Sequence, residues 1–318
     1  MKLLKLVPDD TNIDFVRLRG WAFGLTLVLS LLAVGLTFYH GLNFGVDFEG
    51  GLMIEEKFAT VPDLDRVRQV VDAQGVGDSS LQQFGDPKTI TIRLPVQQGA
   101  DEGATNAVVK KVEAALGQAF PGATFSRYST VSGKVSGELI RNGVLAVVLA
   151  IVGIGLFAIF RFEWQFGVST VVAIIHDLVM TLGFFAITRF EFDLNIVAAV
   201  LTIIGYSIND KIVIDDRIRE NMRRYRKMEM RDIINLSVNE TLPRTVMTSV
   251  TILLALFALL FLGGHVLRGF TAAMILGIVV GTYSSIYVSS SLLITLGLRA
   301  EPTSPREDRA ERIGPREG

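Results

Sequence analysis

The feature that most constrains the fold of this 318-residue sequence is a set of six apolar stretches, each about as long as a membrane-crossing helix. Crossing the hydrocarbon core takes roughly 20 mostly apolar residues, because lipid offers no hydrogen-bond partners to open backbone groups. Half of the residues are hydrophobic and the mean hydropathy is +0.44, which is high for a water-soluble chain. We therefore predict an α-helical polytopic membrane protein with six transmembrane helices, at residues 21–39, 142–160, 166–188, 194–214, 245–262 and 270–298.

The distribution of basic residues predicts the direction of the crossings. Lys2, Lys5, Arg17 and Arg19 precede the first stretch as in a signal peptide, but no small-residue cleavage site follows, so we expect an uncleaved anchor. The positive-inside rule places this end in the cytoplasm, and six crossings return the C-terminus to the same side. The connection after the fourth stretch is then also cytoplasmic, and it is strongly basic: Arg217, Arg219, Arg223, Arg224, Arg226, Lys227 and Arg231.

The polar segment between the first two stretches is long enough to form a small domain. Its periodicity predicts strands at 52–58, 80–84, 89–94 and 123–129 and helices at 62–73 and 104–120, a β-α-β-β-α-β order typical of ferredoxin-like folds. The charged end of the chain cannot bury enough apolar surface to order itself. The predicted organisation is a cytoplasmic N-terminus (1–20), transmembrane helix 1 (21–39), a small periplasmic α/β domain (40–138), transmembrane helices 2–6 (139–298) and a disordered cytoplasmic tail (299–318).

Several functional classes are disfavoured by what the sequence lacks. There are no cysteines and only three scattered histidines, so we expect no disulfide and no metal site. No phosphate-binding loop and no protease or esterase motif is present, so we expect neither an enzyme nor a bound cofactor. The net charge of −1 argues against a nucleic-acid binder. For a membrane protein with buried carboxylates, the remaining energy source is an ion gradient.

Asp210, in the cytoplasmic half of the fourth stretch, is the main candidate for handling a proton. An aspartate at the centre of a membrane helix costs roughly 2.5–3.5 kcal/mol, so it needs a partner or a function. Arg244 directly follows Pro243, and we expect it to begin the fifth helix near the same membrane surface. Burial favours the protonated carboxyl and a nearby arginine favours the charged form, so such a group can bind and release a proton as its surroundings change.

Other polar residues in the predicted helices have two interpretations each. Tyr206, Asn209 and Thr248 are candidate supporting groups near the proton site, whereas Arg244 could instead be a snorkelling anchor. Asp210 could reach interfacial water or pair with Lys211, although adjacent positions on a helix project about 100° apart.

A second pair, His176 and Asp177, lies midway along the third stretch. It is either a second proton-handling element or a satisfied contact between helices. The small-residue spacing of Gly277 and Gly281 in the last stretch predicts close helix packing.

Three motifs carry a family resemblance. The first is Gly45-Val46-Asp47-Phe48-Glu49-Gly50-Gly51, the second is Ile204-Gly205-Tyr206-Ser207-Ile208-Asn209-Asp210, and the third begins Asp216-Arg217. Together they resemble the SecF family, the smaller subunits of the bacterial SecD-SecF protein-export complex within the resistance-nodulation-division superfamily. The resemblance extends from about residue 12 to residue 298.

This resemblance implies an inner-membrane subunit that pairs with SecD beside the SecYEG channel, with YajC as a further partner, and that uses the proton motive force to export unfolded preproteins. It also implies that Asp210 and Arg244 take part in proton movement, while the external domain moves to pull the substrate outwards. Lys211 departs from the small hydroxyl residue expected there. Sodium remains an alternative coupling ion.

Two rival functions follow from the same features. One is a small-molecule exporter of the same superfamily, although such chains usually carry two six-helix halves. The other is a passive assembly factor, in which the buried charges only hold helices or SecD together.

Overall fold

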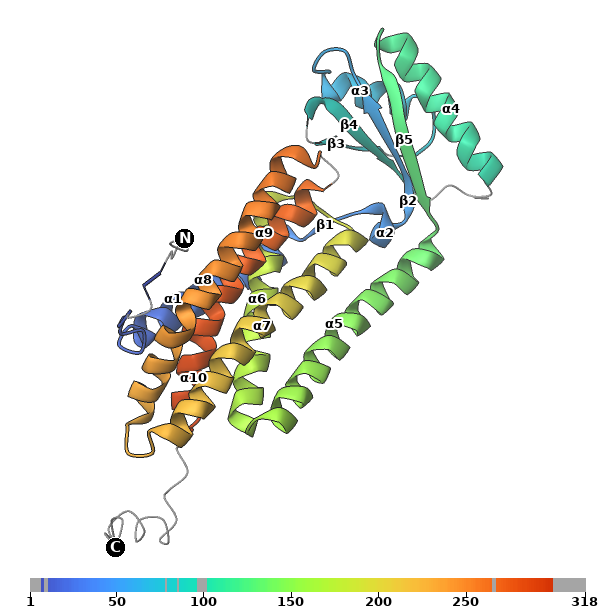
Figure 1. The fold of residues 1–318 in the computed structure, drawn as a ribbon. Helices are drawn as coiled ribbons and strands as arrows, with labels where there is room; N and C mark the ends of the chain where they lie inside the picture. The colour runs from blue at the N-terminus through green and yellow to red at the C-terminus, as the bar shows by residue number, and fades with distance from the viewer. Residues whose placement is uncertain are drawn as a thin grey trace, which may run out of the picture.

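A computed structural model describes residues 7–8, 11–77, 79–84, 86–95, 102–264 and 267–299 of the chain. The molecule is elongated, with a bundle of long helices and a small sheet domain at one end of the bundle (Figure 1). The predicted tail, 299–318, lies outside the described residues except for Arg299.

Among the described residues, six helical segments are long and apolar enough to cross a membrane, as predicted. The first five are longer than the predicted apolar stretches because polar turns extend them at the ends, whereas the last ends three residues before the predicted one. For example, α5 begins at Gly133, where Ser132 caps the helix by accepting from Val135 N. The segments are α1 (Arg19–His40), α5 (Gly133–Arg161), α6 (Trp164–Thr188), α7 (Leu194–Arg224), α8 (Met230–Leu262) and a last one composed of α9 (Arg268–Tyr283), the π-helix η1 (Ser284–Ser289) and α10 (Ser290–Thr295).

Pro243 lies inside α8 instead of preceding it, so the prediction that Arg244 begins the fifth helix is wrong. A proline in a helix interior removes one backbone hydrogen bond at a cost of about 3 kcal/mol. Leu242 and Thr245, on either side of it, are buried, and their packing holds the helix together through the break. The predicted connection after the fourth stretch is therefore mostly helix, formed by the end of α7 and the start of α8.

Glycines allow two close approaches between the long helices. A Cβ added to Gly277 on α9 would lie 2.4 Å from a side-chain carbon of Ile203 on α7, which agrees with the predicted packing role. A Cβ on Gly183 of α6 would lie 2.8 Å from the Cα of Ala33 on α1. The second contact lets α1, which is otherwise little buried, lie against α6.

The sheet domain has every predicted strand and helix in the predicted order. Its four strands pair antiparallel in the order β3-β4-β2-β5. The helices α3 and α4 pack with the sheet around a core that includes Ile54, Ile92, Val67 and Val112. The elements are β2 (Gly51–Lys57), α3 (Leu64–Asp72), β3 (Ser80–Phe84), β4 (Asp86–Leu94), α4 (Glu102–Ala119) and β5 (Thr124–Val131).

One carboxylate lies in this apolar core. Glu56 follows Leu52 and Ile54 on the core-facing side of β2, and it is 1% exposed. Within the described part of the chain, its Oε2 has no hydrogen-bond partner. Burial, with a smaller contribution from Glu113, raises the pKa of Glu56 to about 7.

We expect the Glu56→Gln variant to stabilise the sheet domain at pH 8 but not at pH 4. Because the folded state holds the proton more tightly than the unfolded state, stability falls as pH rises from about 4.5 to about 7. The full loss is about 3 kcal/mol, and glutamine removes it. Amide hydrogen exchange of β2 in the full-length chain in detergent, corrected for the intrinsic effect of pH, measures the change. Glu55→Gln, on the opposite face of the same strand, should leave the pH dependence in place.

Candidate ion-coupling site

Asp210 is buried inside the helical bundle. The side chain is 3% exposed, and its Oδ2 has no hydrogen-bond partner among the described residues. Arg244 is exposed on the neighbouring helix α8. In the described ranges, no ion pair within 4.0 Å joins the two. A buried carboxylate that is neither paired nor hydrogen-bonded at Oδ2 has room to change its protonation state without breaking a tight contact.

The candidate supporting residues fall into two groups. Tyr206 lies one turn before Asp210, and its hydroxyl is 3.2 Å from Ser249 Oγ, which is 3.0 Å from Thr282 Oγ1, so a chain of hydroxyls links α7, α8 and α9. Asn209 is exposed. Thr248 donates to the carbonyls of its own helix at Arg244 and Thr245. The structure therefore places Tyr206 in a network between helices and leaves Asn209 and Thr248 outside it.

Asp177 connects three helical segments. Its Oδ2 accepts hydrogen bonds from Ser207 Oγ on α7 at 2.6 Å and from Ser284 Oγ on η1 at 3.0 Å. Its Oδ1 lies 3.1 Å from His176 Nδ1, and both side chains are buried. Asp177 is thus a satisfied polar contact between helices, one of the two interpretations of this pair; a role in proton handling stays a prediction.

The Asp177→Asn variant should destabilise the bundle by about 1–3 kcal/mol. Asparagine is the same size but replaces a charged acceptor by a weaker one, and it presents an amide to hydroxyls that now donate to Oδ2. The shift in the denaturation midpoint of the purified chain in detergent measures this loss. Ser169→Ala is the matched control, because Ser169 is equally buried on α6 and its hydroxyl bonds only to its own helix at Phe166 O.

Lys211 pairs with Asp215, not with Asp210. Lys211 Nζ lies 2.8 Å from Asp215 Oδ2 and 3.1 Å from Oδ1, and both residues are almost fully buried. Sequence reasoning missed Asp215, although a lysine and an aspartate four residues apart on a helix are a recognisable signal. This pair satisfies the lysine charge inside the bundle and leaves Asp210 without a local cation.

The π-helix η1 lies against the same part of α7. Ser284, at its start, donates to Asp177, and Ser285 Oγ donates to Ser207 O at 3.4 Å. Ser207 is three residues before Asp210, so η1 contacts the turn that carries the candidate proton site. Single π-helical turns inside α-helices are frequent at functional sites.

The glycine-rich motif forms the junction between the bundle and the sheet domain. It includes α2 (Val46–Glu49), and it follows β1 (Asn43–Phe44), which pairs in parallel with β6 (Glu191–Phe192). Asp47 Oδ2 accepts from Leu194 N at the start of α7. Phe48 packs on Phe44 and Phe192, with ring centroids 6.0 Å apart in each pair.

The glycines of this motif permit close backbone contact. Gly45 N donates to Phe192 O, and Gly50 N donates to Val46 O at the end of α2. Gly51 has φ of +112°, and a Cβ there would lie 2.4 Å from Leu94 O. The motif therefore joins the sheet domain to β6 and to the start of α7.

A partly buried ion pair adds to this junction. Arg93 of β4 pairs with Glu191 of β6 at 2.9 Å and donates to Phe44 O at 2.7 Å. Burial raises the pKa of Glu191 and that of Asp193; the Arg93 charge opposes the change at Glu191, and the Asp47 charge adds to it at both. The sheet domain is held on the bundle by charges as well as by packing.

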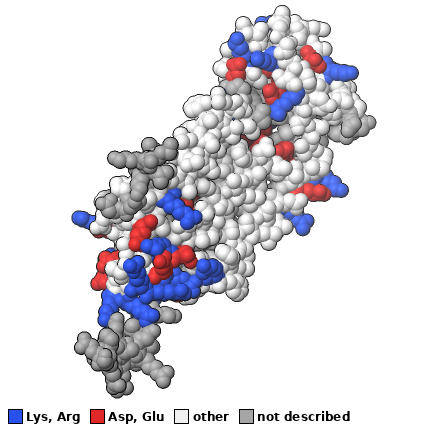
Figure 2. Space-filling view, in the orientation of Figure 1, with Lys and Arg blue, Asp and Glu red and all other residues white. Residues whose placement is uncertain are grey.

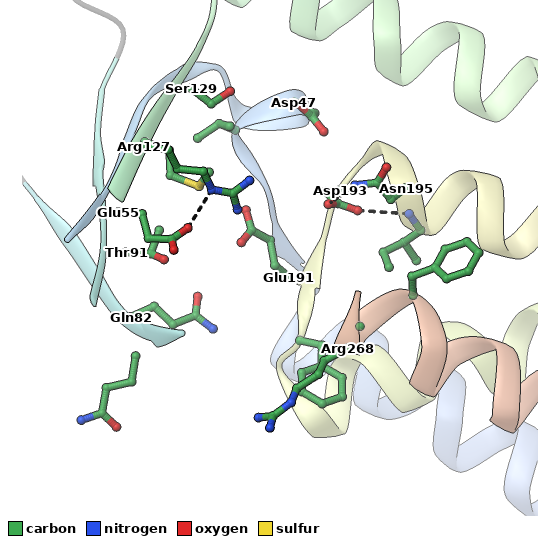
Figure 3. A pocket seen from close by; sticks show the side chains of 17 residues that line it. Asp47, Glu55, Gln82, Thr91, Arg127, Ser129, Glu191, Asp193, Asn195 and Arg268 are labelled. Carbon is green, nitrogen blue, oxygen red and sulfur yellow. Dashed lines mark hydrogen bonds and ion pairs between the residues drawn. The ribbon is translucent and has the colours of Figure 1, made fainter. Parts of the chain in front are cut away.

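A cleft of about 290 Å³ lies beside this ion pair. Figure 3 shows Glu55, Gln82, Thr91, Arg127 and Ser129 on the sheet side of the cleft, and Asp47, Glu191, Asp193, Asn195 and Arg268 around the rest. Arg127 pairs with Glu55 at 2.8 Å across the open face of the sheet. The described part of the chain contains no group of three histidine or acidic residues suited to a metal ion.

The third motif lies at the far end of α7. Asp216 pairs with Arg161 of α5 at 3.2 Å, and Arg217 pairs with Glu240 of α8 at 2.7 Å and with Glu220 at 2.6 Å. These ion pairs join three helices at the end of the bundle opposite the sheet domain, beyond the candidate proton site.

These features together define a class: a polytopic membrane protein whose buried acid lies among helices and whose α/β domain is attached at one end. The family model "Protein export membrane protein SecD/SecF, C-terminal" matches residues 111–299. The chain belongs to this protein-export family, and its close relatives are SecF subunits of protein translocases. The members of this family are components of protein transport, and the family is not one of enzymes.

Two curated relatives cover nearly the whole chain. Protein translocase subunit SecF of Cereibacter sphaeroides is 42% identical over 311 residues, which are 96% of this chain and 95% of the relative. SecF of Pseudomonas aeruginosa is 41% identical over 296 residues, which are 92% of this chain and 94% of the relative.

Two solved structures share the fold. The crystal structure of SecDF, a translocon-associated membrane protein from a Thermus species, has a TM-score of 0.82 and 36% identity and matches 92% of this chain. SecDF in a super-membrane-facing form has a TM-score of 0.68 and 35% identity and matches 98% of this chain. This chain spans about two fifths of each SecDF chain, 39% and 41%.

Proposed function

We propose that this protein couples the proton motive force to the export of preproteins across the bacterial inner membrane, as a subunit that works with SecD. The observation that carries the proposal is Asp210: a carboxylate that is 3% exposed in a helix able to cross the membrane, and whose Oδ2 lacks a hydrogen-bond partner within the described residues. Such a group can be loaded from one side of the membrane and emptied to the other. The SecF relatives are named as protein translocase subunits, which supports protein as the cargo.

Asp210 binds the proton in this mechanism, and Arg244 modulates its affinity. A nearby positive charge favours the ionised form of a carboxyl group, so a change in the distance between the two side chains would shift the balance between proton uptake and release. Arg244 is exposed on this chain, one turn before Thr248 on α8, and is therefore open to a partner surface. Movement of η1 against Ser207 would pass a change at Asp210 to the rest of the bundle.

The sheet domain is the mechanical output in this proposal. We place it on the periplasmic side, with both chain termini in the cytoplasm, and assign it a ferredoxin-like fold. The β-α-β-β-α-β order and the strand order β3-β4-β2-β5 support this fold. Cytoplasmic placement of the arginine-rich end of α7 supports the orientation. The junction at Arg93 and Glu191 ties the domain to the start of α7, the helix that carries Asp210.

SecD is the proposed direct partner, with SecYEG as the channel and YajC as an accessory subunit. The SecDF structures support SecD, because this chain matches about two fifths of each SecDF chain. The remaining length of that chain leaves room for the other subunit. No cofactor is proposed.

Transport in reconstituted vesicles tests the function and identifies the ion. The complex of this chain with SecD, SecYEG and the ATP-driven motor is reconstituted, and proton and sodium gradients are imposed separately. We expect a proton gradient to accelerate export after the ATP-dependent step, and a sodium gradient alone to have no effect. Acceleration by sodium only would reassign the ion, whereas no response to either gradient would contradict the proposed function.

A purely structural role for the two charges makes a different prediction. If Asp210 and Arg244 only held the complex together, exchanging them in an Asp210→Arg/Arg244→Asp double variant would restore assembly with SecD. We expect that exchange to leave export defective even where the complex assembles. Export at the normal rate would show that the pair is a structural one.

A further inference from the structure

A second charged site lies at the end of the bundle opposite the sheet domain. A cavity of about 570 Å³ is lined by Arg161 at the end of α5 and by five residues of α7: Asp216, Arg219, Glu220, Arg223 and Arg224. Figure 2 shows basic and acidic side chains gathered at this end of the molecule, whereas the bundle between the two ends is almost free of charge. None of the steps proposed for proton coupling uses this cavity.

Exposed aromatic side chains mark the level of this cavity in the membrane. Phe160 is 86% exposed and directly precedes Arg161, and Trp164 is 54% exposed at the start of α6. Tryptophan side chains at the ends of membrane helices lie at the level of the lipid headgroups, which places Trp164 there. The cavity between α5 and α7 is therefore at the headgroup level and not in bulk water.

The arginines of the cavity are held in position by the protein. The guanidinium carbons of Arg161 and Arg219 lie 4.9 Å and 5.9 Å from the centre of the buried Phe162 ring. Arg219 also donates to Arg161 O at 3.0 Å, at the end of α5. Guanidinium groups that are stacked on a ring keep their N–H donors in fixed directions, which suits recognition of a phosphate.

The charge of the cavity favours an anion. Four arginines and two carboxylates line it, so the formal excess is two positive charges. Only one of the two carboxylates, Asp216, is paired with an arginine of the cavity, Arg161 at 3.2 Å; Glu220 pairs with Arg217 outside it. The side chains of Arg223 and Arg224 are exposed and can contact an anion that enters the cavity.

An apolar surface continues from the cavity along α5. Leu149, Val152, Leu156 and Phe160 are each about half exposed or more, and they recur at a spacing of three or four residues, which places them in one stripe along the helix. A ligand with a phosphate in the cavity and hydrocarbon chains would lay its chains along this stripe.

We propose that this cavity binds the headgroup of an anionic diacyl phospholipid, with the phosphodiester on Arg219 and Arg223 and the acyl chains along α5. The inference does not depend on export activity, because it requires only that the chain is embedded in a lipid bilayer. Basic pockets between membrane helices on the cytoplasmic side bind such headgroups in general. A zwitterionic lipid has no net negative charge to balance the two excess positive charges of the cavity.

Native mass spectrometry of the purified full-length chain tests the site. Phosphatidylglycerol, cardiolipin and phosphatidylethanolamine with the same acyl chains are added separately in detergent, and bound lipid is counted for the wild type and for Arg219→Gln/Arg223→Gln. We expect the double variant to weaken binding of the two anionic lipids by about tenfold or more. Arg219→Lys/Arg223→Lys keeps the charge and should retain most of that binding, provided that both variants remain monodisperse.

The control removes the same charge from the same end of the molecule. Arg17 and Arg231 line a different cavity, so Arg17→Gln/Arg231→Gln should leave anionic lipid binding nearly unchanged. Equal weakening by the control, or equal binding of phosphatidylethanolamine and phosphatidylglycerol, would show that the arginines act only as general topology anchors and would overturn the proposal. Displacement of bound lipid by millimolar inorganic phosphate would reassign the cavity to a free anion.

Discussion

Replacement of Asp210 by asparagine is expected to abolish gradient-dependent export while leaving the complex assembled. Asparagine has nearly the same volume and no charge, so at this position, which is 3% exposed, it leaves no cavity and costs less to bury than an ionised carboxylate. It cannot carry a proton across the membrane. One elementary charge moved through 100 mV is worth about 2.3 kcal/mol, a bias of roughly 50-fold, so we expect the gradient-driven rate to fall by an order of magnitude or more.

Vesicles that contain the complex measure this rate after the ATP-dependent step, with and without an imposed proton gradient. Asp216→Asn is the matched control, because Asp216 is an exposed acid on the same helix and pairs with Arg161 at 3.2 Å. The control should export at close to the normal rate. Normal gradient-dependent export by Asp210→Asn, in a complex of unchanged composition, would rule out Asp210 as the proton carrier.

Lys211→Met should be the most destabilising of the single substitutions considered for the bundle. The change leaves Asp215 as an unpaired carboxylate that is 1% exposed, and breaking a buried ion pair from one side costs about 3–5 kcal/mol. Removing both charges is different, because apolar residues of similar size replace a buried ion pair at little cost. We therefore expect Lys211→Met/Asp215→Leu to regain most or all of the stability lost in the single variant.

Denaturation midpoints of the purified chain in detergent measure both variants. Recovery in the double variant separates the loss of an ion pair from a loss of packing at position 211. A Lys211→Met variant as stable as the wild type would mean that water or a partner subunit reaches Asp215. Export by the stable double variant then reports whether this charge pair affects Asp210, which lies one position before Lys211 in α7.

The six helices and the elements of the sheet domain could be predicted because their signals are local. Length and hydropathy identify each helix, and the alternation of apolar residues identifies each strand. Local signals misled at Pro243, which marks a helix boundary in most sequences but lies within α8 here because the residues on both sides of it are packed. Local signals also predict a connection at the end of α7 and the start of α8, where the structure has helices. These helical turns are charged, so they do not show the apolar composition by which the membrane-crossing stretches are recognised.

The candidate site was predicted only in part. Asp210 could be identified because a charge within an apolar stretch is costly wherever the helix packs. To identify the partner of Lys211 from the sequence, one would have to choose Asp215, four residues on, over the adjacent Asp210. The contact of Asp177 with Ser284, which is 107 positions away, had no signal in the sequence. Nor did the role of Asp47, which accepts a hydrogen bond from Leu194 N across 147 positions.

The sequence by itself determined that this chain has six lipid-compatible helices, one α/β domain and an acid within a membrane helix. Each of these depends on the transfer free energy or the backbone preference of one continuous segment. Only the tertiary structure decided that Asp177 joins three helical segments, that Lys211 pairs with Asp215, and that Asp210 forms no ion pair within 4.0 Å among the described residues. Those outcomes depend on how each helix is rotated against its neighbours, which is set by the summed packing of many distant side chains and glycine contacts.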